Sequence, residues 1–296
     1  MSIRGTTRLI GLLGDPVGHS LSPAMHNAAL RHIGFDAVYV ALPVKPQDLG
    51  AAVAGLRAFG FLGANVTLPH KAAVIPFLDE ISPLARALGA VNTIVRRPDD
   101  TLYGDTTDAA GFIAAFEDEG HSFDGKTIAL LGNGGSARTI ALGLPMQRNI
   151  KRITIVARNP AKAEALASEV RDSGTAVAIA ALSVEDYAKV RGDHDIVVNT
   201  TPVGMHPAVE ETPLPQDLLE ARQIVYDIVY NPRETRLLRE ARAQGCKTVG
   251  GLGMLIHQGR LAFGMWTGRD VPPEVFRAGI RNATERQGAP DESKAS

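Results

Sequence analysis

The sequence predicts an α/β protein of two domains, each built on an open and mostly parallel sheet. Apolar, strand-like runs alternate with helical segments in two successive series, and this alternation is typical of βα units. The chain has 296 residues, of which 45% are hydrophobic. That length exceeds one typical domain, and the apolar content is sufficient for two cores.

The first series begins with the apolar run RLIGLL at residues 8–13, which Gly14-Asp15-Pro16 ends. Ser22-Pro23 then opens a helix that runs to about Ile33, because serine is a favoured N-cap and proline fits the first turn. Further strands are predicted at residues 37–42, 63–68, 91–95 and 101–104, and helical segments at 46–59 and up to about Leu88. The last two strands suggest a hairpin across residues 98–100. Residues 108–119 are predicted to form a helix that bridges to the second series.

The second series begins after Gly125, where the apolar strand KTIALLG at residues 126–132 runs into NGGSAR. More strands are predicted at residues 153–157, 176–181, 195–200 and 224–230, with a helix from about Pro160. Residues 251–266 carry apolar side chains at helical spacing. The final stretch, GAPDESKAS, lacks such periodicity, and residues 287–296 are predicted to be a disordered tail.

Composition favours a small-molecule ligand over a macromolecular one. The net charge is −1 and no block of like charge occurs, so a nucleic-acid partner is not expected. One cysteine, Cys246, excludes an internal disulfide, and no Cys/His group has metal-ligand spacing. No apolar stretch approaches the roughly 20 residues of a membrane span, and no signal peptide is recognisable. We therefore expect a cytoplasmic protein without a bound metal or a membrane partner.

A glycine-rich loop follows the first strand of the second series. Gly132-Asn133-Gly134-Gly135-Ser136 stands between a strand and a helix, where backbone N–H groups can approach a pyrophosphate. A simple tight turn explains the loop alone equally well. Arg158 follows the next strand, 158 − 132 = 26 residues after Gly132, where NAD-binding folds usually carry an acidic residue. Arginine can bind a 2′-phosphate that a carboxylate would repel, which favours NADP.

A second polar loop, NTTPVGM at residues 199–205, directly follows the strand DIVVN. Ligands of doubly wound sheets lie outside the carboxyl ends of the strands. The loop therefore suits the ribose or nicotinamide side of the cofactor, although a plain turn is also possible.

The first series carries polar residues at its strand ends. Pro69 cannot continue a central ladder, so the strand at 63–68 must stop there and leave Thr67 and Lys71 on either side of the break. Asn92 lies within an apolar segment, where its amide needs hydrogen-bond partners. Helix capping alone would explain Ser22 and Asp108. Ser20 and Ser22 could also both face a polyhydroxylated ligand.

These residues belong to a series of collinear motifs that resembles the shikimate dehydrogenase family, which also includes shikimate/quinate dehydrogenases. The motifs are GLLGDPVGHSLSPAMHNAAL, NVTLPHK, GAVNTI, GDTTDAAGF, LLGNGGSAR, NTTPVGM, YNPRETRLL and GGLGMLIHQG. They extend from about Leu9 to Trp266, so the resemblance covers most of the chain.

The resemblance implies an NADP-dependent oxidoreductase that interconverts 3-dehydroshikimate and shikimate in the biosynthesis of aromatic amino acids. Its matching positions imply that Lys71 and Asp108 form the catalytic pair, with substrate contacts at Ser20, Ser22, Thr67, Asn92, Tyr230 and Gln258. The expected cofactor contacts are Gly132, Asn133, Gly134, Gly135, Ser136, Ala157, Arg158, Asn159, Lys162, Thr200, Ile228 and Gly251. Residues 1–107 would bind the substrate, completed by residues 248–286, and residues 108–247 would form a Rossmann-like NADP-binding domain. The C-terminal helices would pack back on the first domain and bring Gln258 to the substrate.

The chain departs from the family pattern at several motif positions. Thr106 stands where Asn is usual, Asn133 and Ser136 where Ala is usual, and Ala157-Arg158-Asn159 where Asn-Arg-Thr is usual. Two alternatives stay open: a quinate/shikimate dehydrogenase that uses NAD or NADP, and a non-catalytic sensor of shikimate-pathway metabolites. The paired serines favour shikimate, and a sensor would be free to lose the Lys71–Asp108 pair. The protein partner expected is a second copy of the chain, as a homodimer.

Overall fold

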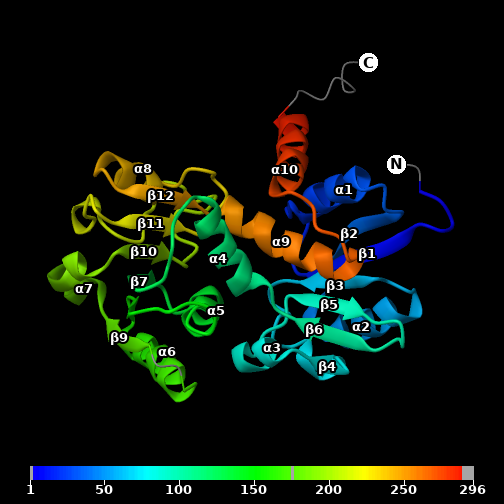
Figure 1. Cartoon of the computed structure of the whole chain (residues 1–296), viewed down its shortest axis with the longest axis horizontal. Coiled ribbons are helices and arrows are strands. Elements are labelled where there is room, and N and C mark those ends of the chain that lie inside the picture. The colour runs from blue at the N-terminus through cyan, green and yellow to red at the C-terminus, as the bar shows by residue number, and fades with distance from the viewer. Residues whose placement is uncertain (1–2, 175–176, 289–296) are drawn as a thin grey trace. The chain divides into compact units, whose positions relative to one another are not determined.

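The computed structural model of the protein describes residues 3–174 and 177–288. The chain divides into two compact units, one made of Met1–Thr107 with Gln258–Ser296 and the other of Asp108–His257. Each unit is built around its own six-stranded sheet (Figure 1). The two-domain α/β fold predicted from the sequence is therefore confirmed. The assignment of one part to substrate and the other to cofactor stays a prediction.

The first unit contains a mixed sheet with the strand order β2-β1-β3-β5-β6-β4. Its strands are β1 (Arg8–Gly14), β2 (Ala37–Pro43), β3 (Gly63–Val66), β4 (Glu80–Ile81), β5 (Thr93–Arg96) and β6 (Leu102–Asp105). β1 pairs in parallel with β2 and β3, and β4 with β6, whereas β5 is antiparallel to both β3 and β6. The predicted hairpin is confirmed as β5 and β6. β4 was missed, because two residues are too few to show strand alternation.

The helices of the first unit are α1 (Ser22–His32), α2 (Leu49–Ala58), α3 (Pro83–Leu88) and α10 (Pro273–Gly288), with short 3-10 turns η1 (Pro46–Asp48) and η2 (Ile75–Phe77). α10 packs closely against α1, because a Cβ on Gly279 would lie 2.6 Å from the Cβ of Ala28. The C-terminal helix thus packs on the N-terminal part of the chain, as expected. It continues to Gly288, two residues into the predicted tail, and residues 289–296 lie outside the described residues.

The second unit contains a wholly parallel sheet with the order β12-β11-β10-β7-β8-β9. Its strands are β7 (Thr127–Leu131), β8 (Arg152–Val156), β9 (Ala178–Leu182), β10 (Ile196–Asn199), β11 (Ile224–Asp227) and β12 (Lys247–Gly250). Counted from β7, this is the order 3-2-1-4-5-6 of dinucleotide-binding sheets. The chain reverses direction across the sheet between β7 and β10, the place where such folds bind their ligands.

The second unit also contains helices. They are α4 (Asp108–Asp118), α5 (Gly135–Gly143), α6 (Pro160–Asp172), α7 (Val184–Val190) and α8 (Arg236–Ala243), with η3 (Arg191–Asp193) and η4 (Gln216–Leu218). α9 (Leu252–Thr267) begins in this unit and continues into the other. The strand predicted at 224–230 ends at Asp227. The strand predicted at 176–181 is β9, although residue 176 itself lies outside the described residues.

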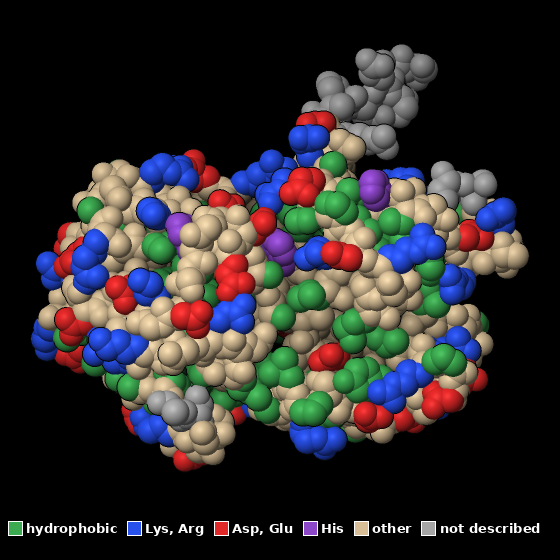
Figure 2. Space-filling model, in the orientation of Figure 1, with side chains coloured by type: hydrophobic (Ala, Val, Ile, Leu, Met, Phe, Trp, Pro, Cys, Tyr) green, Lys and Arg blue, Asp and Glu red, His purple; other side chains and the backbone are tan. Residues whose placement is uncertain are grey.

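Separate apolar clusters stabilise the two sheets. Leu13, Val53 and Ile94 belong to a buried cluster of the first unit, and Leu131, Val197 and Leu237 to one of the second. Figure 2 shows basic and acidic side chains interspersed over the visible face, in keeping with the net charge of −1. Within residues 3–174 and 177–288, no helix has the length and apolar content that crossing a membrane requires.

Candidate active site

One edge of the first sheet gathers the predicted substrate residues of that unit. β1, β3 and β6 end at this edge, and the antiparallel β5 begins there, because Asn65 pairs with Thr93 and Thr93 pairs with Asp105. The loops after β1, β3 and β6 and the segment before β5 therefore meet. They carry Ser20 and Ser22, Thr67 and Lys71, Thr106 and Thr107, and Asn92.

The two serines enter helix α1 in different ways. Ser20 lies before the helix, and its Oγ accepts a hydrogen bond from the backbone N–H of Ser22 at 3.2 Å. Leu21 is the N-cap, without a side-chain capping bond, and Ser22 is a buried residue of the first turn. Capping therefore does not account for Ser22.

The backbone around Lys71 is fixed on two sides. The neighbouring His70 is buried, and its Nε2 lies 2.6 Å from the carbonyl oxygen of Val44. On the other side, the backbone N–H of Val91 donates to the carbonyl of Lys71 at 2.8 Å. Lys71 is half-buried, so this anchored loop holds a lysine at the polar edge of the sheet. The prediction of a strand that stops before Pro69 is confirmed, with β3 ending at Val66.

Asn92 is buried, and the structure supplies the partners that its amide was expected to need. Its Oδ1 accepts from the backbone N–H of Thr107 at 2.9 Å and from the hydroxyl of Thr93 at 2.9 Å. Its Nδ2 donates to Thr107 Oγ1 at 3.0 Å and reaches Gln258 Oε1 at 3.4 Å. Two of the predicted substrate residues, 166 positions apart, thus meet in the first unit.

The segment after β6 contains Thr106, where Asn is usual in the family pattern. Its backbone N–H donates to Asp105 Oδ1 at 2.7 Å, whereas its buried hydroxyl has no hydrogen-bond partner among the residues that the structure describes. Asp108 is the first residue of α4 and is 8% exposed. Lys71 belongs to the first unit and Asp108 to the second, so their pairing stays a proposal.

The glycine loop of the second unit is tightly packed on one side. Gly132 has a φ of +110°, and a Cβ there would lie 2.9 Å from Thr200 Oγ1. Thr200 in turn donates its hydroxyl to the carbonyl of Leu131 at 2.6 Å. The ends of β7 and β10 are therefore locked together, and only glycine fits between them.

The same loop is open on its other side. Gly134 is the N-cap of α5 and has no side-chain capping bond, and a Cβ on Gly134 or Gly135 would meet nothing within 4 Å. A pocket of about 380 Å³ lies in front, lined by Asn133, Gly134, Gly135, Arg138, Lys162 and Glu169. The first N–H groups of a helix lack intrahelical partners and favour an anion. The exposed Ser136 follows them in the first turn. These residues fit a dinucleotide phosphate.

Basic side chains line this pocket and follow strand β8. Arg158 follows β8 and is exposed, as is Lys162 in the first turn of α6. Asn159 caps α6, because its Oδ1 accepts from the backbone N–H of Lys162 at 3.2 Å. Arg138 is held by Glu169, whose oxygens lie 2.9 and 3.0 Å from its Nε. An exposed arginine directly after β8 is a group that can bind a 2′-phosphate.

The other predicted cofactor positions lie at the carboxyl ends of neighbouring strands. Ala157 is buried directly after β8, and Ile228 follows β11. Gly251 follows β12, and a Cβ on it would lie 2.1 Å from the carbonyl oxygen of Ile228. Tyr230 is half-buried, and burial raises the pKa of its phenol. The structure thus brings these positions to the edge that also carries Gly132 and Thr200.

A buried carboxylate at this edge was missed from the sequence. Asp227 ends β11 and accepts hydrogen bonds from Thr235 Oγ1 at 2.6 Å, Asn199 Nδ2 at 2.9 Å and the backbone N–H of Val229 at 3.0 Å. Burial raises the pKa of Asp227 to about 6. It fixes the loops after β10 and β11. A carboxylate inside the apolar run IVYDIVY was the signal for it.

Comparisons with known proteins agree with this arrangement. The sequence models described as "Shikimate dehydrogenase substrate binding domain", "Shikimate / quinate 5-dehydrogenase" and "Shikimate 5'-dehydrogenase C-terminal domain" match residues 12–94, 115–236 and 251–280. The shikimate dehydrogenase (NADP(+)) of Moorella thermoacetica is 46% identical over 284 residues, which cover 96% of each chain. The chain belongs to the shikimate dehydrogenase family. The resemblance found in the sequence is confirmed.

Solved structures place the fold in the same family. A shikimate dehydrogenase in complex with NADP⁺ superposes with a TM-score of 0.87 at 40% identity, covering 95% of this chain and 97% of that one. A quinate dehydrogenase from Corynebacterium glutamicum in complex with NAD gives a TM-score of 0.86 at 33% identity, covering 93% and 99%. The shikimate dehydrogenase fold is thus shared by proteins that bear either substrate's name.

Proposed function

We propose that the protein is an NADP-dependent shikimate dehydrogenase that reversibly reduces 3-dehydroshikimate to shikimate in aromatic amino acid biosynthesis. The observation that carries the proposal is the half-buried Asn92–Gln258 amide pair, at the same sheet edge as Thr67 and Lys71. Amides and hydroxyls converging on one edge suit a small ring bearing hydroxyls and a carboxylate. The relative that is 46% identical bears this activity in its name.

Lys71 and Asp108 are the proposed catalytic pair. When bound, NADPH supplies the hydride. Reduction of a ketone also requires a proton for the developing alkoxide, and an ordinary lysine ammonium carries one at neutral pH. Lys71 donates this proton and recovers it from the hydroxyl in the reverse direction. Asp108 orients the ammonium group and accepts a hydrogen bond from the same substrate hydroxyl.

The first unit provides most of the proposed substrate contacts. Residues 1–107, completed by residues 248–286, form the substrate-binding part of this proposal. The side chains that would hydrogen-bond the ring substituents and the carboxylate are Ser20, Ser22, Thr67, Asn92 and Gln258, with Tyr230 from residues 108–247. Hydroxyl groups and amide groups differ in which hydrogen bonds they donate and accept, so together these side chains can distinguish substrate hydroxyls from a carboxylate.

The second unit provides the proposed cofactor contacts. Backbone N–H groups of residues 132–136 would hold the pyrophosphate at the start of α5. Arg158 and Lys162 would hold the 2′-phosphate, beside Ala157 and Asn159. Thr200, Ile228 and Gly251 would contact the ribose and nicotinamide side. The exposed Arg158, where an acidic residue would select NAD, supports NADP.

Two alternatives differ in specific respects. A quinate/shikimate dehydrogenase that uses NAD is supported by the likeness to the quinate dehydrogenase solved with NAD. Arg158 argues against a strict NAD enzyme, and the serines at positions 20 and 22 favour shikimate. A non-catalytic metabolite sensor would not need Lys71 and Asp108, and this chain has both.

Initial rates with two substrates and two cofactors test these possibilities. We expect rapid oxidation of NADPH by 3-dehydroshikimate, slower oxidation of NADH, and in the reverse direction a preference for shikimate over quinate. Faster turnover of quinate with NAD would establish the first alternative. Ligand binding without NADPH oxidation would establish the sensor.

Two further properties are proposed with the activity. We expect the enzyme to work in the cytoplasm, where cell fractionation should recover it, and to form a homodimer. Light scattering during size-exclusion chromatography gives the molar mass, which should be twice that of the 31.4 kDa chain.

A further inference from the structure

A chain of buried side chains lies behind Asn92. Tyr39 of β2, Asn65 of β3 and Thr93 of β5 are exposed by 1%, 6% and 0%. Tyr39 Oη lies 2.8 Å from Asn65 Oδ1, and Asn65 Nδ2 lies 3.3 Å from Thr93 Oγ1. The Thr93 hydroxyl lies 2.9 Å from Asn92 Oδ1. All four residues belong to the first unit.

Backbone groups determine the direction of every hydrogen bond in this chain. Asn65 Nδ2 donates to the backbone carbonyl of Asn92 at 3.1 Å, and a carbonyl can only accept. The other end of the Asn65 amide is therefore oxygen, to which Tyr39 must donate. Burial raises the pKa of Tyr39 well above its usual range, so the phenol keeps its proton.

A second backbone group fixes the Asn92 amide. The N–H of Thr107 can only donate, and it donates to Asn92 Oδ1 at 2.9 Å. The hydroxyl of Thr93 accepts from Asn65 Nδ2, so its single hydrogen is available for the same Oδ1. These two donors are the shortest contacts of the Asn92 carbonyl oxygen, which the Thr107 hydroxyl also approaches at 3.3 Å. The Nδ2 end of the amide is consequently the end that faces Gln258.

We propose that Thr93 is a positioning residue that fixes the Asn92 amide so that Asn92 meets the substrate only as a hydrogen-bond donor. This inference rests on the proposed function, in which Asn92 contacts the substrate. The ligand must then present an accepting oxygen at this point, from a hydroxyl, a carbonyl or a carboxylate. A ligand that offers only a hydrogen there is rejected, because two donors would face each other without an acceptor.

A purely structural threonine would give a different pattern of effects. Thr93 is fully buried in a central strand, so its replacement could simply loosen the sheet. Such loosening would act on both ligands and would not depend on the side chain at position 92. Positioning acts through Asn92 alone, and a double-mutant cycle separates the two roles.

The experiment compares wild type with Thr93→Val, Thr93→Ser, Asn92→Ala and the double variant Thr93→Val/Asn92→Ala. Loss of the Thr93 hydrogen bond should lower kcat/KM for shikimate about tenfold, the usual effect of one buried hydrogen bond. We expect an unchanged KM for NADP⁺, and Thr93→Ser should restore most of the activity. In the Asn92→Ala background, Thr93→Val should have no further effect. Melting temperatures monitor folding, and Thr93→Ala replaces Thr93→Val if the latter does not fold.

Additive effects of the two substitutions would overturn the inference, as would an equal loss of affinity for NADP⁺ or an unchanged kcat/KM in Thr93→Val. Titration calorimetry measures the dissociation constant of shikimate for wild type, the two single variants and the double variant, which gives a second double-mutant cycle. Binding without turnover in the wild type would overturn the proposed activity and leave the cycle readable. A wild type that does not bind shikimate would overturn both.

Discussion

The two units differ in how they expose the polar groups of their proposed ligand sites. At the edge of the first sheet, the side chains of Asn65, Asn92 and Thr93 are buried and hydrogen-bonded to one another. At the edge of the second, Gly134, Gly135 and Lys162 are exposed around an open pocket. Buried groups with fixed directions can distinguish the hydroxyls of a small ring. An open loop of backbone N–H groups suits a phosphate, whose charge needs no particular orientation.

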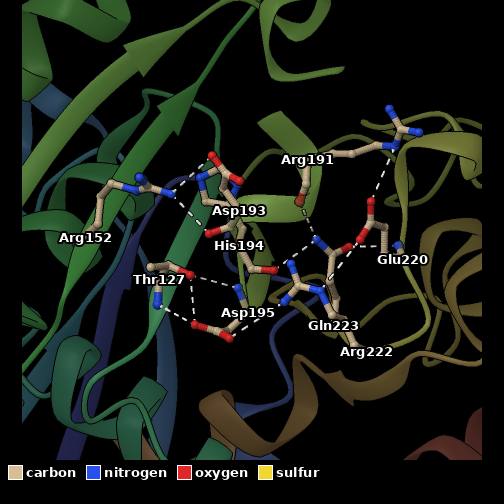
Figure 3. A network of polar contacts seen from close by, with 9 residues as sticks. All are labelled: Thr127, Arg152, Arg191, Asp193, His194, Asp195, Glu220, Arg222 and Gln223. Atoms are coloured by element: carbon tan, nitrogen blue, oxygen red, sulfur yellow. Dashed lines mark hydrogen bonds and ion pairs between the residues drawn. The ribbon is translucent and has the colours of Figure 1, made fainter. Parts of the chain in front are cut away.

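The two ends of the strands in the second sheet also differ. Figure 3 shows a polar network at the amino ends of its strands, where Asp195 Oδ2 accepts from the backbone N–H and the hydroxyl of Thr127 at 2.9 and 2.8 Å. Gln223 Nε2 donates to the carbonyls of Arg191 and His194 at 2.9 and 3.1 Å. The network bridges segments at the starts of β7, β10 and β11. We assign it to stability, because ligands of such sheets bind at the opposite end.

The largest expected effect is that of Lys71→Ala. Loss of the acid–base group should lower kcat about 10²- to 10⁴-fold, with little change in the dissociation constants of shikimate and NADPH. Steady-state rates and titration calorimetry measure the two quantities. Lys45→Ala, at an exposed lysine of the same unit, is the matched control and should turn over normally. Near-normal turnover of Lys71→Ala would remove Lys71 from the mechanism.

Asp227→Asn should change the pH dependence of stability. Burial raises the pKa of Asp227 from 3.8 to about 6, so the folded state favours the protonated acid. Its stabilising contribution is fully present below pH 3.8 and is lost as the pH rises through about 6. This change in pKa corresponds to about 3 kcal/mol of unfolding free energy. Urea unfolding across this pH range should show the difference between wild type and variant changing by about that amount. An unfolding free energy that depends on pH in the same way in wild type and variant would contradict the raised pKa of Asp227.

Arg158→Ala should weaken one cofactor selectively. Loss of a charge-assisted hydrogen bond to the 2′-phosphate should raise KM for NADPH about ten- to a hundredfold, while KM for NADH stays unchanged. Arg171→Ala, at an exposed arginine of helix α6 in the same unit, should alter neither KM value. Equal losses with both cofactors would show that Arg158 does not recognise the 2′-phosphate.

The smallest effect is expected at the amino end of the second sheet. Asp195→Ala removes the acceptor for Thr127 and should lower the free energy of unfolding by about 1–2 kcal/mol. Values of kcat/KM for both ligands should stay at the wild-type level at a temperature where the variant is folded. A selective loss of NADPH affinity would mean that this network is part of the cofactor site.

Most of the fold could be predicted because periodic apolar runs marked the longer strands. β4 was missed because two residues show no alternation, and β12 because KTVG contains a single apolar side chain, Val249. The positions of Lys71, Asn92 and Gly132 could be read from polar residues at strand ends. The partners of Asn92 could not, because Asn65 lies inside a strand pattern and Gln258 is 166 residues away. Such contacts depend on sheet register, which no local pattern specifies.

A crystal structure of the enzyme with shikimate and NADPH tests the central claim most directly, which is that the first unit orients the substrate and the second holds the cofactor. The account predicts that one ring hydroxyl lies within hydrogen-bonding distance of Lys71 Nζ and the Asp108 carboxylate, with Asn92 Nδ2 donating to a substrate oxygen. It also predicts the 2′-phosphate at Arg158. A substrate bound away from Lys71, or Asn92 contacting it through Oδ1, would contradict the account.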